Sequence, residues 1–151
     1  MEITRAKSRN INELIDLFSE ARETISRLGI DQWQNGYPSK EIIEEDIELN
    51  RLYVVMSDNK LCGTFVMIND GEPTYDHIFN GNWLTGNDST SYIAIHRVAI
   101  AVAARGQGIS TKIINYAIEY AKSLSRDSLR IDTHEGNIVM RRMLEKHGFK
   151  Y

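Results

Sequence analysis

The fold is decided by residues 98–124, which read VAIAVAARGQGISTKIINYAIEYAKSL. An apolar run comes first, glycines follow at positions 106 and 108, and apolar residues then recur at helical spacing as far as Leu124. This order predicts a strand, a glycine-containing turn and a helix. Because the first N–H groups of a helix have no partner within it, the turn predicts a binding site for an anion such as phosphate.

Three classes of ligand-binding turn are possible interpretations of this sequence. Glycine lets the backbone approach a phosphate closely, and Arg105 supplies a guanidinium for its charge. A nucleotide P-loop requires G-x-x-x-x-G-K-[ST], and the spacing here is different. A dinucleotide-binding turn requires G-x-G-x-x-G, but Thr111 stands at the third glycine position. Only 19 residues follow Asp132, too few for the remaining parallel strands of that fold.

The rest of the chain is a single series of short elements without an internal repeat. Periodicity and capping residues predict strands at 3–6, 52–56, 61–68, 92–102 and 129–133, and helices at 10–28, 39–49, 109–125 and 137–146. A loop at 69–90 separates two of the strands, and loops of that length are usually functional or mobile. The alternation predicts one α/β domain over residues 1–151.

Composition limits the function classes. The 151 residues carry a formal charge of -3, with 42% hydrophobic and 26% charged residues, as in an ordinary folded domain. The single cysteine, Cys62, makes no intramolecular disulfide and no thiolate zinc site, which favours a reducing cytoplasm. No apolar run approaches the roughly 20 residues that span a bilayer, so we expect no membrane partner. Basic residues lack an accompanying aromatic platform, so we expect no nucleic-acid partner either.

A third class fits the turn best. The hexamer at 105–110 resembles the Q/R-x-x-G-x-G/A turn of the acetyl-CoA-dependent N-acetyltransferase superfamily, GNAT, with Ser110 in place of the final Gly or Ala. The resemblance extends to 96–100 before the turn, to 130–134, Asn137 and the Gly-Phe pair at 148–149 after it, and to 32–39. It implies an α/β fold with a mixed, mostly antiparallel central sheet flanked by helices and splayed at the two strands around the acetyl-CoA site.

The resemblance also implies how acetyl-CoA binds, as a cosubstrate and without a metal. The pyrophosphate is expected on the turn, the pantetheine arm along the strand before it, and a backbone N–H near Val98 or Ala99 on the oxyanion. Asn137 is expected to reach the arm from the last helix. The expected cofactor-binding residues are Val98, Ala99, Ile100, Arg105, Gly106, Gln107, Gly108, Ile109, Ser110 and Asn137.

The implied reaction is direct attack of a primary amine on the acetyl thioester. An alkyl amine with a pKa of about 10.4 costs roughly 4.6 kcal/mol to deprotonate at pH 7, so the site needs a base or must lower the pKa of the amine. His96 is the candidate base because it shares a strand face with Val98; the alternative is a packed strand histidine. Leu144 stands where many members place a tyrosine acid, which leaves water, another tyrosine or direct thiolate release.

Several points stay open at the level of sequence. The acceptor is a polyamine, an amino acid, an aminoglycoside or a protein N-terminus. Trp33 and Tyr37 either line the acceptor cleft or fill the core. The alternative from another class is a CoA-binding or sensing module without turnover. A strand is expected at Phe149, where the sequence stops; its edge would then recruit a second copy of the chain into a homodimer, unless the sequence is trimmed.

Overall fold

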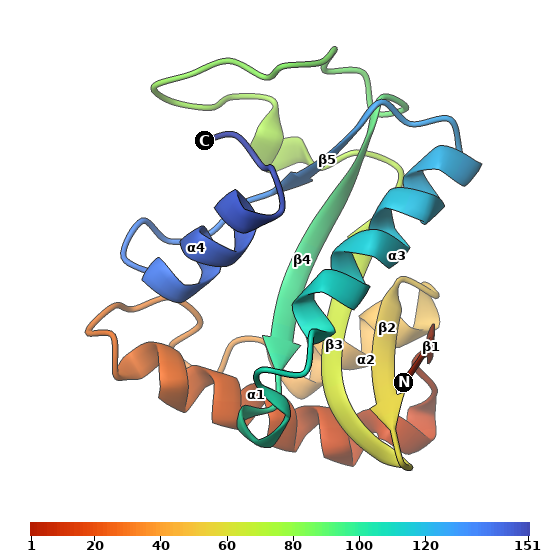
Figure 1. Ribbon diagram of the computed structural model, residues 1–151, viewed down its shortest axis with the longest axis vertical. Coiled ribbons are helices and arrows are strands. Elements are labelled where there is room, and N and C mark those ends of the chain that lie inside the picture. The colour runs from red at the N-terminus through yellow and green to blue at the C-terminus, as the bar shows by residue number, and fades with distance from the viewer.

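The computed structural model describes residues 1–151, which form one five-stranded sheet with helices on both sides (Figure 1). The strands are β1 (Glu2–Arg5), β2 (Leu52–Ser57), β3 (Lys60–Ile68), β4 (Tyr92–Ile100) and β5 (Ser128–Ile131). The helices are α1 (Ile11–Ser26), α2 (Lys40–Glu48), α3 (Ile109–Ser123) and α4 (Ile138–Lys146), with single 3-10 turns at Ser8–Asn10, Pro73–Tyr75 and Val102–Ala104. None of the helices combines the length and apolar character that crossing a membrane requires.

The strands lie in the sheet in the order in which they occur in the chain, β1-β2-β3-β4-β5. The first three pairings are antiparallel, and β4 pairs with β5 in parallel. A parallel pair needs a crossover connection, and α3 supplies it between β4 and β5. The expected mixed, mostly antiparallel sheet is therefore confirmed.

Both faces of the sheet are buried, because α1 and α2 cover one face and α3 covers the other (Figure 1). Successive strand residues point to opposite faces. On β2, Leu52 and Val54 pack in the cluster that includes α1, whereas Tyr53 and Val55 pack in the cluster that includes α3. Burial on both faces explains why the inner strands are nearly continuous apolar runs.

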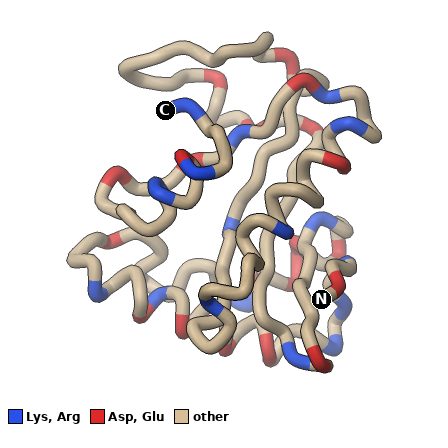
Figure 2. The backbone as a smooth tube through the Cα atoms, viewed as in Figure 1, with Lys and Arg blue, Asp and Glu red and all other residues tan.

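Charged residues lie mainly on the helices and loops, and the central strands are largely free of them (Figure 2). On the edge strand β5, the charged residue Arg130 is only 3% exposed. Its guanidinium lies 4.1 Å from the ring centre of Trp83 and 4.0 Å from that of Tyr92, and it donates to the carbonyl of Gly86 at 2.7 Å. Arg130 thereby attaches the β3–β4 loop (residues 69–91) to the sheet.

The strand expected at Phe149 is absent. The N–H of Phe149 instead donates to the carbonyl of Leu144 at 3.0 Å, and that of Gly148 donates to Glu145 at 3.0 Å, so both close the end of α4. The last strand on this side is β5, which ends at Ile131. Pairing of a sheet edge with a second copy of the chain stays a prediction.

Candidate active site

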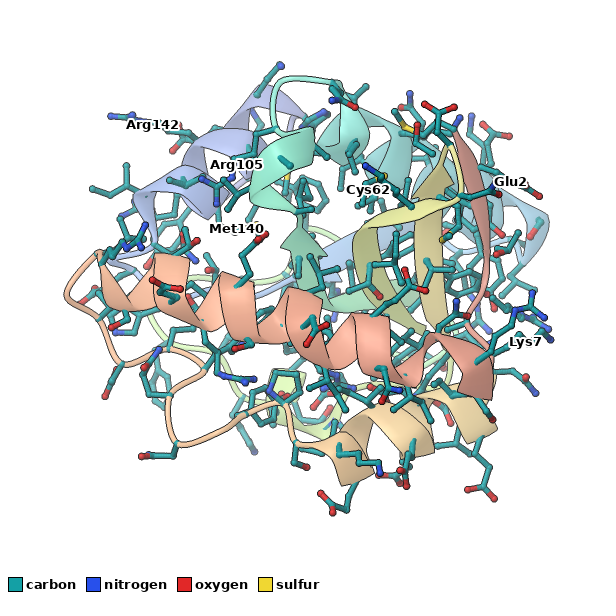
Figure 3. All side chains as sticks on the ribbon, turned by 90° about the horizontal axis from the view of Figure 1, so that it is seen from below. Glu2, Lys7, Cys62, Arg105, Met140 and Arg142 are labelled. Atoms are coloured by element: carbon teal, nitrogen blue, oxygen red, sulfur yellow. The ribbon has the colours of Figure 1, made fainter.

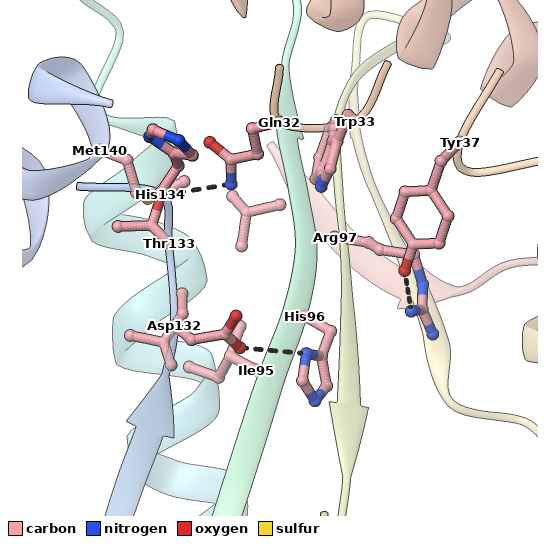
Figure 4. Close-up of a pocket in the computed structure, with 12 residues that line it drawn as sticks. Gln32, Trp33, Tyr37, Ile95, His96, Arg97, Asp132, Thr133, His134 and Met140 are labelled. Atoms are coloured by element: carbon pink, nitrogen blue, oxygen red, sulfur yellow. Dashed lines mark hydrogen bonds and ion pairs between the residues drawn. The ribbon is translucent and has the colours of Figure 1, made fainter. Parts of the chain in front are cut away.

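A cavity opens where β4 and β5 separate. Their parallel ladder ends at the pair Ile95 and Ile131, after which β5 stops and β4 continues to Ile100. The cavity that follows has a volume of about 490 Å³ (Figure 4). Its walls come from β4, the residues after β5, the loop between α1 and α2, and Met140 of α4. The splayed strand pair is thus present.

β4 carries a β-bulge beside this cavity. The single residue Phe65 of β3 faces two residues of β4, Arg97 and Val98, and Arg97 has a φ of 50°. A non-glycine residue in the left-handed region is uncommon and occurs often at functional sites. The bulge takes the backbone near Val98 out of the regular ladder, at the position where the oxyanion-binding N–H is expected.

Side chains from α2 and from the loop before it hold the bulge. Arg97 donates to Asp46 through Nε at 2.8 Å and through Nη2 at 2.9 Å. Its Nη1 donates to the hydroxyl of Tyr37 at 2.8 Å (Figure 4). The loop that contributes Tyr37 to the cavity wall is therefore connected to the bulge by a hydrogen bond from a charged group.

The glycine turn has the conformation that the sequence predicted. Gly106 and Gly108 have φ values of 79° and 77°, and the space beside each is open. The N–H of Arg105 donates to the carbonyl of Val102 at 3.2 Å, whereas the N–H groups of residues 106–108 donate no hydrogen bond within the chain. In α3, the N–H of Lys112 donates to the carbonyl of Gly108 at 3.1 Å. Arg105, labelled in Figure 3, is exposed on the same turn. These N–H groups together form a cradle suited to an anion.

His96 lines the cavity and lies between two carboxylates. Its Nε2 is 3.2 Å from Oε2 of Glu72, and its Nδ1 is 3.8 Å from Oδ1 of Asp132 (Figure 4). Burial lowers the pKa of His96 below its ordinary value, although both carboxylates act to raise it. The imidazole is therefore neutral near pH 7 and able to accept a proton.

Glu72, Tyr75 and Asp132 were not among the site residues predicted from the sequence. Tyr75 is 4% exposed and donates its hydroxyl hydrogen to Asp132 at 2.7 Å. Burial and the charge of Asp132 raise the pKa of Tyr75 far above its ordinary range, so the phenol stays protonated. The one signal in the sequence was the length of the β3–β4 loop, from which Glu72 and Tyr75 come.

Asn137 lies beside the cavity with its side chain already engaged. It is 6% exposed, its oxygen accepts from the N–H of Met140 at 3.1 Å, and its amide nitrogen donates to Gln32 at 2.9 Å. Gln32 also donates to the hydroxyl of Thr133 at 3.3 Å. Asn137 thus caps α4 and joins it to the loop between α1 and α2.

Leu144 lines a second cavity of about 520 Å³, on the outer side of β5. Tyr37 lines the first cavity, and the ring centre of Tyr75 lies 5.9 Å from that of His96, with the two rings tilted by 33°. No three His, Cys, Asp or Glu side chains are grouped in a way that could hold a metal ion.

Residues 11–149 match the protein family described as the acetyltransferase (GNAT) family. The chain belongs to this family. GNAT enzymes transfer acetyl groups and use acetyl-CoA, which agrees with the function that the glycine turn predicts.

Individual GNAT proteins resemble the chain over different lengths. A GNAT acetyltransferase from Streptococcus agalactiae has 33% sequence identity and a TM-score of 0.88, over 99% of this chain and 85% of that one. The uncharacterized N-acetyltransferase YvbK of Bacillus subtilis is 24% identical over 113 residues, which are 75% of this chain and 61% of YvbK. An acetyltransferase from Clostridium acetobutylicum, solved with acetyl-CoA, shares the fold at a TM-score of 0.65 and 19% identity, over 99% of this chain and 90% of that one.

Proposed function

We propose that the chain is an N-acetyltransferase that moves the acetyl group of acetyl-CoA to a primary amine. The observation that carries the proposal is the order of features along β4 and beyond it. His96 comes first, the bulge at Arg97 and Val98 follows, and the turn with free N–H groups comes last. In the proposal these features serve in turn as base, oxyanion site and pyrophosphate site along β4 and the turn that follows it.

In this proposal acetyl-CoA binds from the turn inward. The pyrophosphate rests on the N–H groups of residues 106–111, with Arg105 adding a positive charge. The pantetheine arm enters between β4 and β5 and pairs with the backbone of Val98 and Ile100. The acetyl oxygen then meets an N–H near the bulge, which stabilises the negative charge that develops during attack. Asn137 keeps α4 in position beside the arm.

The acceptor amine occupies the part of the cavity lined by Trp33, Tyr37 and His96. Asp132 and Glu72 face His96, and Asp46 offsets part of the charge of Arg97, so the local field favours a cation. An amine arrives mostly as the ammonium ion at pH 7, and His96 removes its proton. The neutral amine then attacks the acetyl carbon and the C–S bond breaks. The nitrogen loses its second proton to water as the amide forms.

Tyr37 is the proposed source of a proton for the departing thiolate. Its oxygen accepts a hydrogen bond from Arg97, so its own hydrogen is free to be donated into the cavity that it lines. The hydroxyl of Tyr75 is already used by Asp132. Tyr37 therefore fills the role that Leu144 is unable to take.

The proposal is tested by measuring thiol release from acetyl-CoA with four amines: spermidine, lysine, kanamycin and a peptide with a free N-terminus. Turnover with at least one of them is expected, with one acetyl group found on the amine by mass spectrometry for each thiol released. The presence of Leu144 favours one alternative, a CoA-binding module without turnover. Calorimetric binding of CoA together with no thiol release from any amine would establish that alternative instead.

A further inference from the structure

The β3–β4 loop (residues 69–91) brings a carboxylate to the buried side of His96. Trp83, within this loop, packs against Arg130 of β5, and its indole N–H donates to the carbonyl of Tyr75 at 2.9 Å. The N–H of Glu72 donates to the hydroxyl of Tyr92 at 2.8 Å. These contacts hold the loop at Glu72 itself and at Trp83, further along the loop.

The carboxylate of Glu72 is itself oriented. Its Oε1 accepts from the hydroxyl of Thr74 at 2.8 Å and from the N–H of Thr74 at 3.3 Å. Its Oε2 is left to face Nε2 of His96 at 3.2 Å, and the Glu72 side chain is 17% exposed. Nε2 of His96 is buried and has no hydrogen-bond partner within the chain. Its contact with Glu72 is within hydrogen-bond distance but is not aligned as a hydrogen bond. Glu72 is the acceptor within its reach.

The two ring nitrogens of His96 have unequal surroundings. Asp132 lies 3.8 Å from Nδ1, beyond hydrogen-bond distance, is 69% exposed, and already accepts the hydroxyl of Tyr75. Glu72 lies closer to Nε2 and is far less screened by solvent. A neutral imidazole carries one N–H, which goes to the nitrogen with the better acceptor. The proton therefore belongs on Nε2, and Nδ1, which faces Asp132 across the space between the strands, is left unprotonated (Figure 4).

We propose that Glu72 is a positioning residue that selects the Nε2–H tautomer of His96 and so presents Nδ1 as the proton acceptor for the amine. This inference rests on the proposed function. In the step concerned, a proton passes from the ammonium ion to Nδ1, and the electron pair of the broken N–H bond stays on the amine nitrogen. The imidazolium that forms lies between Glu72 and Asp132. Both carboxylates favour this charge, whereas Arg97 opposes it, and Tyr75 stays neutral.

The test compares two variants that each remove one negative charge beside His96. Histidine ring ¹⁵N–¹H NMR spectra of the unliganded protein report tautomer and pKa, and the His96 signals are assigned as those lost in His96→Asn. The wild type is expected as the Nε2–H tautomer. Glu72→Gln should move His96 toward the Nδ1–H tautomer and lower its pKa, because a charge that raises the pKa is gone. Asp132→Asn should also lower the pKa but keep the Nε2–H tautomer.

These measurements need neither acetyl-CoA nor an acceptor, so they are independent of the test of the proposed function. If Glu72→Gln unfolds, Glu72→Asp, which withdraws the carboxylate by one carbon, should produce a smaller shift in the same direction. With any amine that turns over, Glu72→Gln should lower kcat by about tenfold or more with an unchanged KM for acetyl-CoA. An Nδ1–H tautomer in the wild type, or an unchanged tautomer in both Glu72 variants, would overturn the inference.

Discussion

Asp46 of α2 and Arg97 of the β4 bulge form a buried ion pair with two hydrogen bonds. The Asp46 side chain is completely buried, and that of Arg97 is 12% exposed. Arg51 also donates to Asp46, at 2.7 Å. One carboxylate therefore pairs with two guanidinium groups, one of which belongs to the residue in the left-handed conformation.

Asp46→Asn should destabilise the protein by about 3–5 kcal/mol, because it leaves Arg97 buried without its counter-charge. The free energy of unfolding in urea measures the loss. Glu44→Gln on the same helix is the matched control, since its pair with Lys40 spans 3.7 Å and is solvent-exposed. That variant should change stability by no more than about 0.5 kcal/mol. Equal effects of the two substitutions would contradict a special role for the buried pair.

Gly108→Asp should abolish the stabilisation of the protein by CoA. CoA at about a hundred times its Kd is expected to add roughly 2.7 kcal/mol to the wild type. The new carboxylate would repel the pyrophosphate, and the left-handed φ of 77° adds a strain of about 1 kcal/mol.

Gly29→Asp controls for that strain. Gly29 has a φ of 75° and open space beside it, and it lies at the end of α1 rather than on the turn. This variant should melt at a lower temperature than the wild type but keep the full thermal shift with CoA. A preserved shift in Gly108→Asp would remove the turn from the proposed binding site.

His96→Ala should lower kcat/KM by about a hundredfold or more at pH 7 while CoA binding stays normal. Because burial lowers the pKa of His96, the acid limb of the wild-type pH profile should lie below about 6.5, the ordinary histidine value. Activity falls as the pH drops through that limb, since the imidazolium is unable to accept a proton. His77→Ala, at an exposed histidine, should leave the profile unchanged. Turnover within severalfold of wild type in His96→Ala would return His96 to a packing role.

Gly136→Ala should loosen the contact between the two loops that flank the cavity. A Cβ at residue 136 would lie 2.5 Å from Cγ2 of Ile30, which requires one loop to move. The expected cost is about 1–3 kcal/mol in unfolding free energy. Ile30→Ala removes the clashing methyl group and should therefore recover part of this loss in the double variant. Gly86→Ala, where the space is open, serves as the neutral control.

The strands and helices were predictable from sequence to within about two residues at most boundaries, and the reason is physical. Burial on both sheet faces makes β3 and β4 almost wholly apolar, and Gly29 and Gly148 take positive φ values at helix ends. The glycine turn was also predictable, because Gly106 and Gly108 have a local conformational role. The strand expected at Phe149 was wrong because the end of α4 uses its N–H.

The walls of the cavity were less predictable, because contacts between distant residues create them. Gln32 and Asn137 are 105 positions apart in the sequence, and their hydrogen bond is a property of the folded chain alone. Glu72 meets His96 only because the β3–β4 loop folds back. Nothing local in the sequence shows that Arg97 adopts a positive φ, since glycine, asparagine and aspartate are the residue types that favour that conformation.

The position of Arg130 also sets an order for assembly during synthesis. The loop that carries Glu72 precedes β4 in the chain, but the guanidinium that fastens it belongs to β5, which pairs with β4 only after the α3 crossover has formed. A nascent chain that ends before residue 130 therefore lacks the contacts of Arg130 with Trp83 and Gly86, although Tyr92, which accepts from the N–H of Glu72, is already present. The loop beside His96 therefore receives its attachment to β5 only after most of the chain has been synthesised.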